Sequence, residues 1–535
     1  MDETHCIDYR NTGYFSKLIC DYLDQKPELQ KYYNRFPSIE NFKAQIEDRK
    51  PFQKEQRELL AEVLTEQYQS ITSGKEKTTK NILQLRDSNT FTVVTGHQLN
   101  IFTGPLYFIY KIISTINLCK QLKDQYPDLN FVPVYWMASE DHDFAEINYI
   151  NFKGEKLVWS KQDGGPVGRF STDGLKEVIE ELAQKMGPGT FANQFAELLK
   201  SSYLDNNNLA AATRQLTHSL FGDDGLVVID GDDAKLKRSM IPHFTRELFE
   251  GISHKEVSQT SSTLQQEYFE QVHPREINLF YILDGVRERI VNNGNRWEVL
   301  ETSISFTKEE IEQELINHPE RFSPNVILRP LYQEVILPNL AYIGGGGELA
   351  YWFQLKGMFK AFDVPFPILS LRNSVLWVDE KSDKQIEKLE ISVDQLFRPI
   401  EDAKGDFVRE RAALDMELEP YEQKLQQMFD DLEEVANLTD RSMLGAVNAQ
   451  RQKQLNGLEN LKKKLVKAEK KRQEVSMSRF DKLHETLFPN GSLQERYSNL
   501  SELYLEYGSS FISTLKSRLN PLDFRFLVLA SKSKN

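Results

Sequence analysis

Cysteine is scarce in this chain. Its 535 residues contain only Cys6, Cys20 and Cys119, which lie far apart. Three scattered thiols do not form a disulfide framework, and they lack the paired spacing of a cysteine-rich zinc site. We therefore expect a protein of the reducing cytoplasm with no evident zinc site.

Long hydrophobic runs are absent as well. No apolar stretch approaches the roughly 20 residues that cross a bilayer, and residues Met1–Cys6 lack the basic and apolar regions of a secretory signal.

Positive charge is also in deficit, because the formal net charge is −14. Since a negative chain repels phosphate backbones, the sequence disfavours a nucleic-acid partner, and we expect neither nucleic-acid nor membrane binding.

The remaining composition is that of a large folded protein, with 40% hydrophobic and 27% charged residues. A chain of 535 residues exceeds one compact core, so we expect two or three domains. We place an α/β core at residues 1–379, a helical arm at 380–489, and a C-terminal segment at 490–535 that returns to the core.

The region from Phe91 to Asn148 carries the clearest pattern. Two apolar runs, Phe91–Val94 and Phe131–Ala138, flank an amphipathic segment from Leu106 to Gln121. This order predicts a strand, a helix and a second strand, the βαβ unit of a parallel sheet. Both strands of such a unit end at the same edge, where α/β proteins bind ligands.

Other apolar runs alternate with helical segments and predict a Rossmann-like, doubly wound sheet. We expect these further strands at 225–229, 279–283, 326–330, 341–343 and 365–369, with one helix over 349–362. Insertions that are mostly helical are expected at about 154–220 and 240–325.

Glycine and proline become scarce from Lys381 to Leu487, where leucines recur at helical spacing. A break at Asn437–Asp440, with Thr439 or Asp440 able to cap a new helix, predicts a hairpin of two long helices. Their apolar stripes lead us to expect a homodimer through this arm, with packing on its own core as the alternative. The leucines that approximate a heptad seam are Leu455, Leu458, Leu461 and Leu465.

The first predicted strand ends in a polar turn with two glycines, a histidine and two amides. Glycine permits close approach of the backbone to a ligand. The helix after Pro105, with Thr103 as its expected cap, directs free N–H groups at the turn and favours phosphate or carboxylate. Polar groups that merely cap the helix are the alternative. The binding candidates here are Thr95, Gly96, His97, Gln98, Asn100, Thr103 and Gly104.

The second strand ends in Glu140, Asp141, His142 and Asp143. Three adjacent carboxylates repel one another, so the segment calls for a proton, a cation or a substrate amine. A substrate ammonium group and a magnesium ion beside a nucleotide phosphate both meet this need. Zinc would find His142 and a carboxylate but no thiolate partners. A solvated acidic loop is the alternative.

The glycine run Gly344–Gly347 is a weaker anion-binding candidate. It matches neither the dinucleotide fingerprint nor the Walker A pattern, and a flexible connector explains it almost as well. Glu348, Tyr351 and Trp352 follow on the next helix, and the segment Asp284–Arg289 together with Arg329 could complement carboxylates.

Several of these segments together resemble the family of cysteine-adding enzymes of bacillithiol biosynthesis. The resemblance begins with Thr95–Gln98, Phe102–Tyr107 and Lys111, and continues with Val132–Trp136 running into Glu140–Asp143 and Ile147–Asn148. It extends, in order, to Asp284–Arg289, Ser323–Pro330, Gly344–Trp352 and Asn520–Asp523.

The resemblance implies a nucleotidyltransferase-like core of the class I aminoacyl-tRNA synthetase kind, with connecting-peptide insertions and a coiled-coil dimerisation domain. It implies that ATP activates the carboxyl of cysteine as an adenylate. The cysteine is then joined to the amine of glucosaminyl malate, and bacillithiol is formed. The ligand- or nucleotide-binding residues that it adds are Tyr107, Lys111, Asn148, Arg329, Gly344, Gly345, Glu348, Tyr351 and Trp352. Arg372, after the last core strand, is a further candidate.

Two departures from the family pattern matter. His97 stands where the family commonly has glutamine, which argues against acid–base catalysis by this residue. The lysine–serine loop of the synthetases has no counterpart after the last core strand, and Ser531–Lys534 imitate it only superficially. Lys111, Arg329 or Arg372 would then meet the charge of a transferring phosphate.

The sequence thus predicts a cytoplasmic cysteine ligase. Glu140, Asp141, His142 and Asp143 would orient an ammonium group or a metal and provide the general base, which is needed because an ammonium group cannot attack until it loses a proton. A nucleotidyltransferase acting on another carboxylic acid and a non-catalytic, nucleotide-sensing scaffold are the competing hypotheses.

Overall fold

The computed structural model of the chain describes residues 4–161, 164–411 and 418–530. Among these residues, five parallel strands form the central sheet in the order β13–β12–β2–β3–β6, which confirms the predicted Rossmann-like core. β2 is buried along its whole length, and fully buried parallel strands are apolar on both faces. The strands are β2 (Thr90–His97), β3 (Asn130–Met137), β6 (Val227–Asp230), β12 (Asn339–Gly344) and β13 (Ile368–Leu371).

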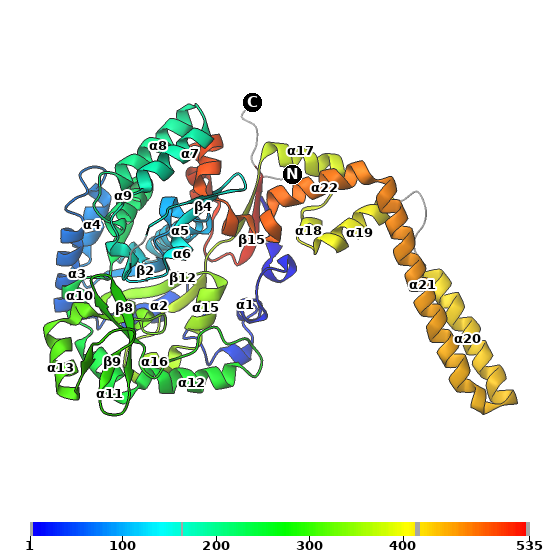
Figure 1. The fold of residues 1–535 in the computed structure, drawn as a ribbon, viewed down its shortest axis with the longest axis horizontal. Helices are drawn as coiled ribbons and strands as arrows, with labels where there is room; N and C mark the ends of the chain where they lie inside the picture. Colours follow the sequence, from blue (N-terminus) through cyan, green and yellow to red (C-terminus); the bar gives the residue numbers. More distant parts are fainter. Residues whose placement is uncertain (1–3, 162–163, 412–417, 531–535) are drawn as a thin grey trace.

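The predicted crossover helix is α5 (Tyr107–Gln125), which packs against β2 and β3. Thr103 does not cap it: Leu106 stands at the N-cap, and Thr103 has a left-handed φ of 74° within a 3-10 turn. The N-terminal helices pack around the same sheet, α2 against β12 and α3 and α4 against β6 (Figure 1). They are α1 (Lys17–Leu23), α2 (Asn41–Arg49), α3 (Lys54–Gln67) and α4 (Glu76–Gln84).

The first insertion is mostly helical, as predicted. After α6 (Phe144–Ile147), the hairpin of β4 (Tyr149–Phe152) and β5 (Glu155–Val158) precedes three helices that stack on one another, and the third of them reaches β6. These helices are α7 (Leu175–Met186), α8 (Thr190–Tyr203) and α9 (Leu209–Phe221).

The second insertion contains a separate antiparallel sheet in the order β10–β9–β8–β7–β11. The strand predicted at 279–283 lies here and not in the parallel sheet, which corrects the prediction. The reason is local: Asp284 and Gly285 (φ 72°) turn β7 directly back into β8, whereas a parallel pair needs a long crossover. The strands are β7 (Leu279–Leu283), β8 (Val286–Asn292), β9 (Trp297–Val299), β10 (Ser305–Phe306) and β11 (Phe322–Pro324), accompanied by α10 (Ala234–Arg238), α11 (Ile241–Glu250), α12 (Ile252–Leu264) and α13 (Lys308–Asn317).

Two further predictions are wrong in detail. The segment 326–330 is not a strand, because α14 (Arg329–Ile336) begins there with Pro330 in its first turn, a position that proline favours. The helix predicted over 349–362 is broken into α15 (Gly346–Trp352) and α16 (Lys356–Ala361). At the break, the side chain of Gln354 accepts hydrogen bonds from the backbone of residues 271 and 272.

The two ends of the described chain meet in a third sheet, β1–β15–β14. β1 (Thr4–Asp8) runs antiparallel to β15 (Arg525–Ala530), which runs parallel to β14 (Val375–Val378). Before β15 the chain forms α23 (Gln494–Tyr497), α24 (Leu500–Tyr507) and α25 (Ser510–Arg518), so the C-terminal segment returns to the core, as predicted. Ser531–Lys534 lie outside the described residues.

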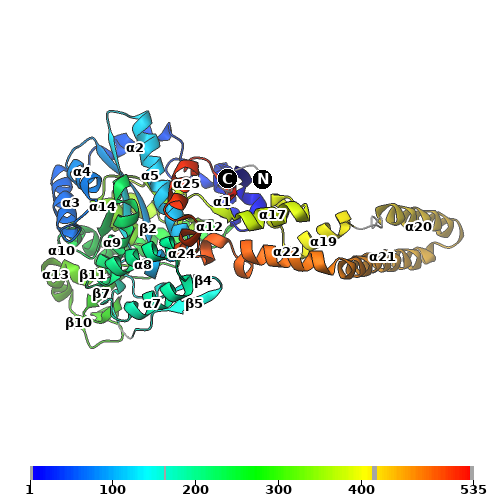
Figure 2. The same ribbon diagram turned by 90° about the horizontal axis from the view of Figure 1, so that it is seen from above.

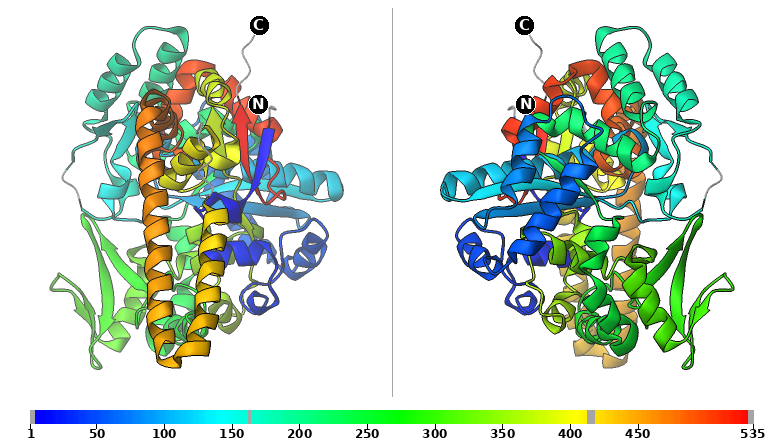
Figure 3. Two further views of the ribbon diagram at one scale, coloured as in Figure 1. Left: turned by 90° about the vertical axis from the view of Figure 1, so that its right-hand side faces the viewer. Right: turned by 90° about the vertical axis from the view of Figure 1, so that its left-hand side faces the viewer.

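A long pair of helices, α20 (Glu419–Thr439) and α21 (Leu444–Arg472), projects from the body (Figures 1 and 2). The two helices run side by side in opposite directions (Figure 3), and Asp440 caps the turn between them by accepting a hydrogen bond from the N–H of Ser442. This confirms the predicted hairpin. Shorter helices join it to the body: α17 (Glu380–Leu389), α18 (Val393–Leu396), α19 (Ile400–Arg411) and α22 (Glu474–Leu487).

Candidate functional site

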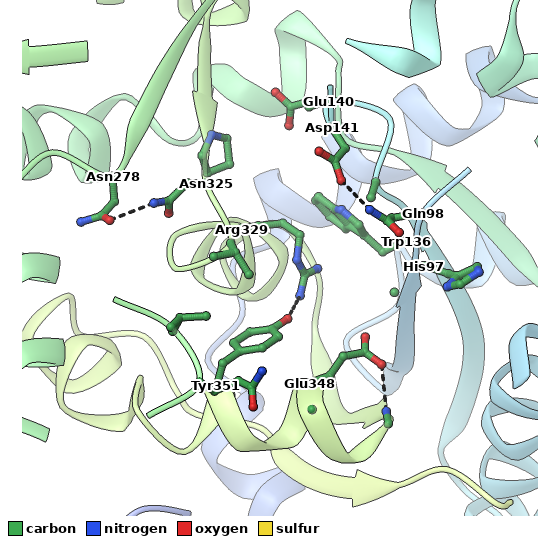
Figure 4. Close-up of a pocket in the computed structure, with 18 of the residues that line it drawn as sticks. His97, Gln98, Trp136, Glu140, Asp141, Asn278, Asn325, Arg329, Glu348 and Tyr351 are labelled. Carbon is green, nitrogen blue, oxygen red and sulfur yellow. Dashed lines mark hydrogen bonds between the residues drawn. The ribbon is translucent and has the colours of Figure 1, made fainter. Parts of the chain in front are cut away.

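A cavity of about 780 Å³ opens at the carboxyl ends of β2, β3 and β12. It lies between this edge of the parallel sheet and the antiparallel sheet of the second insertion (Figure 4). The turn after β2 and the acidic segment after β3 both line it, so the expectation that they share one cavity is confirmed. Gln98 Nε2 donates to Asp141 Oδ2 at 2.9 Å and joins the two segments directly.

The turn after β2 is held from beneath by α5. Lys111, on that helix, donates from Nζ to the carbonyl oxygen of Gly96 at 2.7 Å. A Cβ at Gly96 would stand 3.2 Å from the hydroxyl oxygen of Tyr342, so a larger residue would crowd this wall. A Cβ at Gly104 would stand 2.5 Å from the Cβ of Asn100. Glycine is needed at this position because of that clash and because its φ of 62° is left-handed.

His97 is buried between the rings of Tyr107 and Phe108, whose centroids lie 5.3 and 5.1 Å from its own. Burial lowers the pKa of His97 well below its ordinary value, and the charges of Lys111 and Arg372 lower it further. The imidazole is therefore neutral at neutral pH. Its Nε2 has no hydrogen-bond partner among the described residues, and His97 also borders a small second cavity of about 10 Å³.

The acidic segment after β3 divides into residues with different surroundings. Glu140 is buried and lies 2.6 Å from the Nζ of Lys237, itself fully buried. Burial raises the pKa of Glu140, and Lys237 opposes that shift. Asp141 lines the cavity and keeps partial access to solvent. His142 Nδ1 accepts a hydrogen bond from Arg287 at 2.7 Å, because a guanidinium can only donate.

Glu348, in the first turn of α15, is the carboxylate of the opposite wall. It lies 2.5 Å from Lys111 Nζ and accepts hydrogen bonds from the Tyr342 hydroxyl (2.7 Å) and the Gly345 N–H (2.8 Å). Burial alone would raise the pKa of Glu348, but these partners, Lys111 above all, hold it below its ordinary value. Burial lowers the pKa of Lys111, and Glu348 opposes that shift. The two form a buried ion pair.

Arg329 and Arg372 both line the cavity, but only one of them pairs with a carboxylate. Arg329 donates to the Tyr351 hydroxyl (3.4 Å) and to Gln333 (3.0 Å), which are neutral acceptors (Figure 4). Arg372 instead forms a two-pronged ion pair with Glu495, at 2.7 and 2.9 Å. Within the described chain, Arg329 therefore keeps an unpaired positive charge and Arg372 does not.

The cavity brings together predicted site residues from the carboxyl ends of the strands and from the helices α5, α14 and α15 beside them. They are Gly96, His97, Gln98, Tyr107, Lys111, Glu140, Asp141, His142, Arg329, Gly345, Glu348, Tyr351 and Arg372.

The other predicted site residues do not line this cavity. They are Thr95, Asn100, Thr103, Gly104, Asp143, Asn148, Gly344 and Trp352. Several have structural partners instead: the Thr95 hydroxyl donates to the Ile343 carbonyl within the sheet, Asn148 donates to the Trp159 carbonyl, and Trp352 stacks on the ring of Tyr342. Asp143 is exposed in front of α6.

The cavity also contains residues that the sequence did not single out. Arg275, Asn278 and Asn325 come from the second insertion, and Arg496 comes from α23, near the C-terminus. Two arginines of the predicted Asp284–Arg289 segment, Arg287 and Arg289, also line the wall. No sequence signal marks Arg496, because only the return of the C-terminal segment to the core brings it here.

Among residues 4–161, 164–411 and 418–530, no group of three or more His, Cys, Asp or Glu side chains is arranged to hold a metal ion. Over that part of the chain, no helix has the length and apolar character needed to span a bilayer.

Two family descriptions match the chain. Residues 2–373 match "Bacillithiol biosynthesis BshC, N-terminal Rossmann-like domain", and residues 375–531 match "Bacillithiol biosynthesis BshC, C-terminal coiled-coil domain". A protein of Flavobacterium johnsoniae named "Putative cysteine ligase BshC" is 51% identical over 98% of this chain and 99% of its own length. Proteins with the same name from Christiangramia forsetii and Cytophaga hutchinsonii are 49% and 39% identical, over 98% and 97% of this chain and 99% and 97% of their own lengths.

Proposed function

Because this chain belongs to the BshC family of bacillithiol biosynthesis, we propose that it is the ligase that joins the carboxyl group of L-cysteine to the amine of glucosaminyl malate. The observation that carries the proposal is the cavity at the carboxyl edge of the sheet, where Asp141, a partly accessible carboxylate that pairs with no lysine or arginine of the described residues, faces several guanidinium groups. Such a cavity suits an amine nucleophile together with anionic groups.

We assign the role of general base to Asp141. Glu140 is neutralised by Lys237, Asp143 lies outside the cavity, and His142 uses its Nδ1 to accept from Arg287. Asp141 accepts from Gln98 on Oδ2 and from the backbone N–H groups of His142 and Asp143 on Oδ1, and its side chain is partly accessible. It would accept the proton that the substrate ammonium group must lose before its nitrogen attacks the activated carboxyl carbon.

ATP is the proposed co-substrate, and it would supply the activation of the cysteine carboxyl. Lys111 and Arg372 are already paired with Glu348 and Glu495, which favours other cations for the phosphates. Arg329 and Arg496 line the cavity without a carboxylate partner among the described residues, and we assign them to the phosphates. Magnesium is proposed only as the ion that accompanies these phosphates, and no residue is assigned to it.

A homodimer through the α20–α21 hairpin is part of the proposal, as is a cytoplasmic location. The hairpin buries Phe429 and Ala436 between its helices but leaves other apolar side chains exposed, which favours a second copy as their cover. The exposed side chains are Met428, Leu432, Val435, Leu438, Leu461 and Leu465.

The direct test is reconstitution. Purified protein incubated with cysteine, glucosaminyl malate and ATP should form bacillithiol, measured by mass spectrometry of the derivatised thiol. Omission of ATP should abolish the product, and cells that lack the protein should accumulate glucosaminyl malate. Formation of the corresponding amide from another acid, and none from cysteine, would instead favour a different adenylating enzyme.

A further inference from the structure

Arg287 and Arg289 lie on the same face of β8, because alternate residues of a strand share a face. Both line the cavity. The pairing of β7 with β8 sets Phe280 opposite Arg289, and the guanidinium of Arg287 lies over the Phe280 ring, 4.0 Å from its centroid. Arg275, which precedes β7, lines the same wall.

Among the described residues, no carboxylate lies within bonding distance of these guanidinium groups, although Glu140, Asp141 and Asp232 act on Arg287 from further away. Arg287 is only 8% exposed, and its hydrogen-bond acceptors are all neutral: the Ser323 hydroxyl, the Pro324 carbonyl and His142 Nδ1. In the described part of the chain, the side chain of Arg289 makes no hydrogen bond or ion pair. Like charges side by side on a strand repel, and a buried cation without a partner is costly. The wall is therefore suited to an anion.

The spacing favours two anionic groups over one. Residues two apart on a strand are separated by about 6.6 Å. At this spacing, each of the two guanidinium groups can bind a different anionic group of one small molecule. A guanidinium fork matches a planar carboxylate with two parallel hydrogen bonds. Asn278 and Asn325 line the same wall, but their amides bond each other at 2.8 Å and bond neighbouring protein groups, so the guanidinium groups are what the wall offers to a ligand.

We propose that Arg287 and Arg289, with Arg275 at the rim, form a subsite for the two carboxylates of the amine-bearing acceptor. This inference rests on the proposed function and adds the binding position of the acceptor. The malate end of the acceptor lies on β8, and its amine points towards Asp141. The phosphates of ATP would bind elsewhere in the cavity, at Arg329 and Arg496.

The test is the variant Arg289→Gln in the full-length protein, because Arg289 has no partner whose loss would disturb the fold. Loss of a charge-assisted hydrogen-bonded pair should raise the KM for glucosaminyl malate by about 10- to 100-fold. The KM values for cysteine and ATP should change by less than about twofold. Arg238→Gln is the charge-matched control, because Arg238 is exposed on α10 and lies outside the cavity.

A second measurement does not depend on turnover. Malate alone should bind the wild-type protein in calorimetry and compete with the acceptor, and Arg289→Gln should lose this binding while inorganic phosphate is unaffected. An increase in the KM for ATP, loss of phosphate binding or unchanged malate binding would overturn the inference. If the wild-type protein binds malate through Arg289 but forms no bacillithiol, the subsite stands and the proposed ligase reaction fails.

Discussion

Arg372 and Glu495 are 123 positions apart, on opposite sides of the whole helical arm, yet their side chains meet in a buried ion pair at 2.7 and 2.9 Å. Arg372 follows β13 at the edge of the cavity, and Glu495 lies on α23 next to Arg496. The C-terminal segment thus completes the site. The helical arm, which lies between Arg372 and Glu495 in the sequence, projects away from the body (Figure 2).

Removal of one partner should therefore be costly. Glu495→Ala leaves Arg372 buried and unpaired, and we expect the free energy of unfolding to fall by about 3–5 kcal/mol. Urea denaturation measures this value. Glu506→Gln, a change at an exposed residue of α24, should alter it by less than about 0.5 kcal/mol. Equal stability of both variants would show that the pair does not anchor the segment.

Asp141 and Asp143 give a matched pair of variants within one loop. Asp141→Asn removes the proposed base and should lower kcat by about 10²- to 10⁴-fold, with the thermal unfolding temperature unchanged. Asp143→Asn should keep kcat within about twofold of the wild type, because Asp143 is exposed and outside the cavity. A large loss at Asp143 with full activity at Asp141 would reverse the assignment.

His97 should not titrate in the working pH range, because burial lowers its pKa well below the ordinary value. His97→Gln keeps a neutral polar group at this place. We expect kcat to stay within about tenfold of the wild type, less than the loss of an acid–base catalyst causes. The pH profile of kcat between about pH 6 and pH 8 should keep its shape. If the pH profile of His97→Gln lacked an ionisation that the wild-type profile shows in this range, His97 would be acting as a proton carrier.

Glu334 should make stability depend on pH. It is fully buried and accepts hydrogen bonds from Asn339 and Gln333, and burial raises its pKa to about 7. In the unfolded chain a glutamate titrates near 4.3, so the folded state binds this proton more tightly. The stabilisation from this group is present in full below about pH 4 and is lost as the pH rises through about 7.

The variant Glu334→Gln removes this titration. Its free energy of unfolding should vary between about pH 5 and pH 8 by up to roughly 3 kcal/mol less than that of the wild type. Glu47→Gln, at an exposed position on α2, should keep the wild-type dependence. Parallel curves for the wild type and Glu334→Gln would contradict the assignment.

The arm should hold two copies together. Val435 and Leu438 are 55% and 87% exposed near the end of α20, so the double change Val435→Glu and Leu438→Glu should leave the hairpin folded but convert a dimer to a monomer. Analytical ultracentrifugation measures the mass, and Glu434→Gln on the same helix is the control. A wild-type protein that sediments as a monomer at micromolar concentration would rule out this interface.

Much of the core could be predicted because its signals are local. β2 and β3 each contain an apolar run, and α5 shows helical spacing between them, so the sequence predicted their order and the edge at which Gly96 and Asp141 would meet. The hairpin was visible for the same reason, since Asp440 interrupts two long helical patterns. The sequence predicted a strand at 279–283 correctly but assigned it to the wrong sheet. The spacing of hydrophobic residues indicates a strand but does not indicate which strand it will pair with.

Sequence alone determined the class of fold, the two loops of the site and the arm, since periodicity and turn chemistry act between residues close in the chain. The tertiary structure decided which charges remain free. Lys237 neutralises Glu140, Glu348 pairs with Lys111 and Glu495 pairs with Arg372, while Asp141 and the arginines of β8 line the cavity without a partner of opposite charge among the Lys, Arg, Asp and Glu side chains described. These pairings join residues that lie tens to hundreds of positions apart. They follow from packing, which local sequence patterns do not encode.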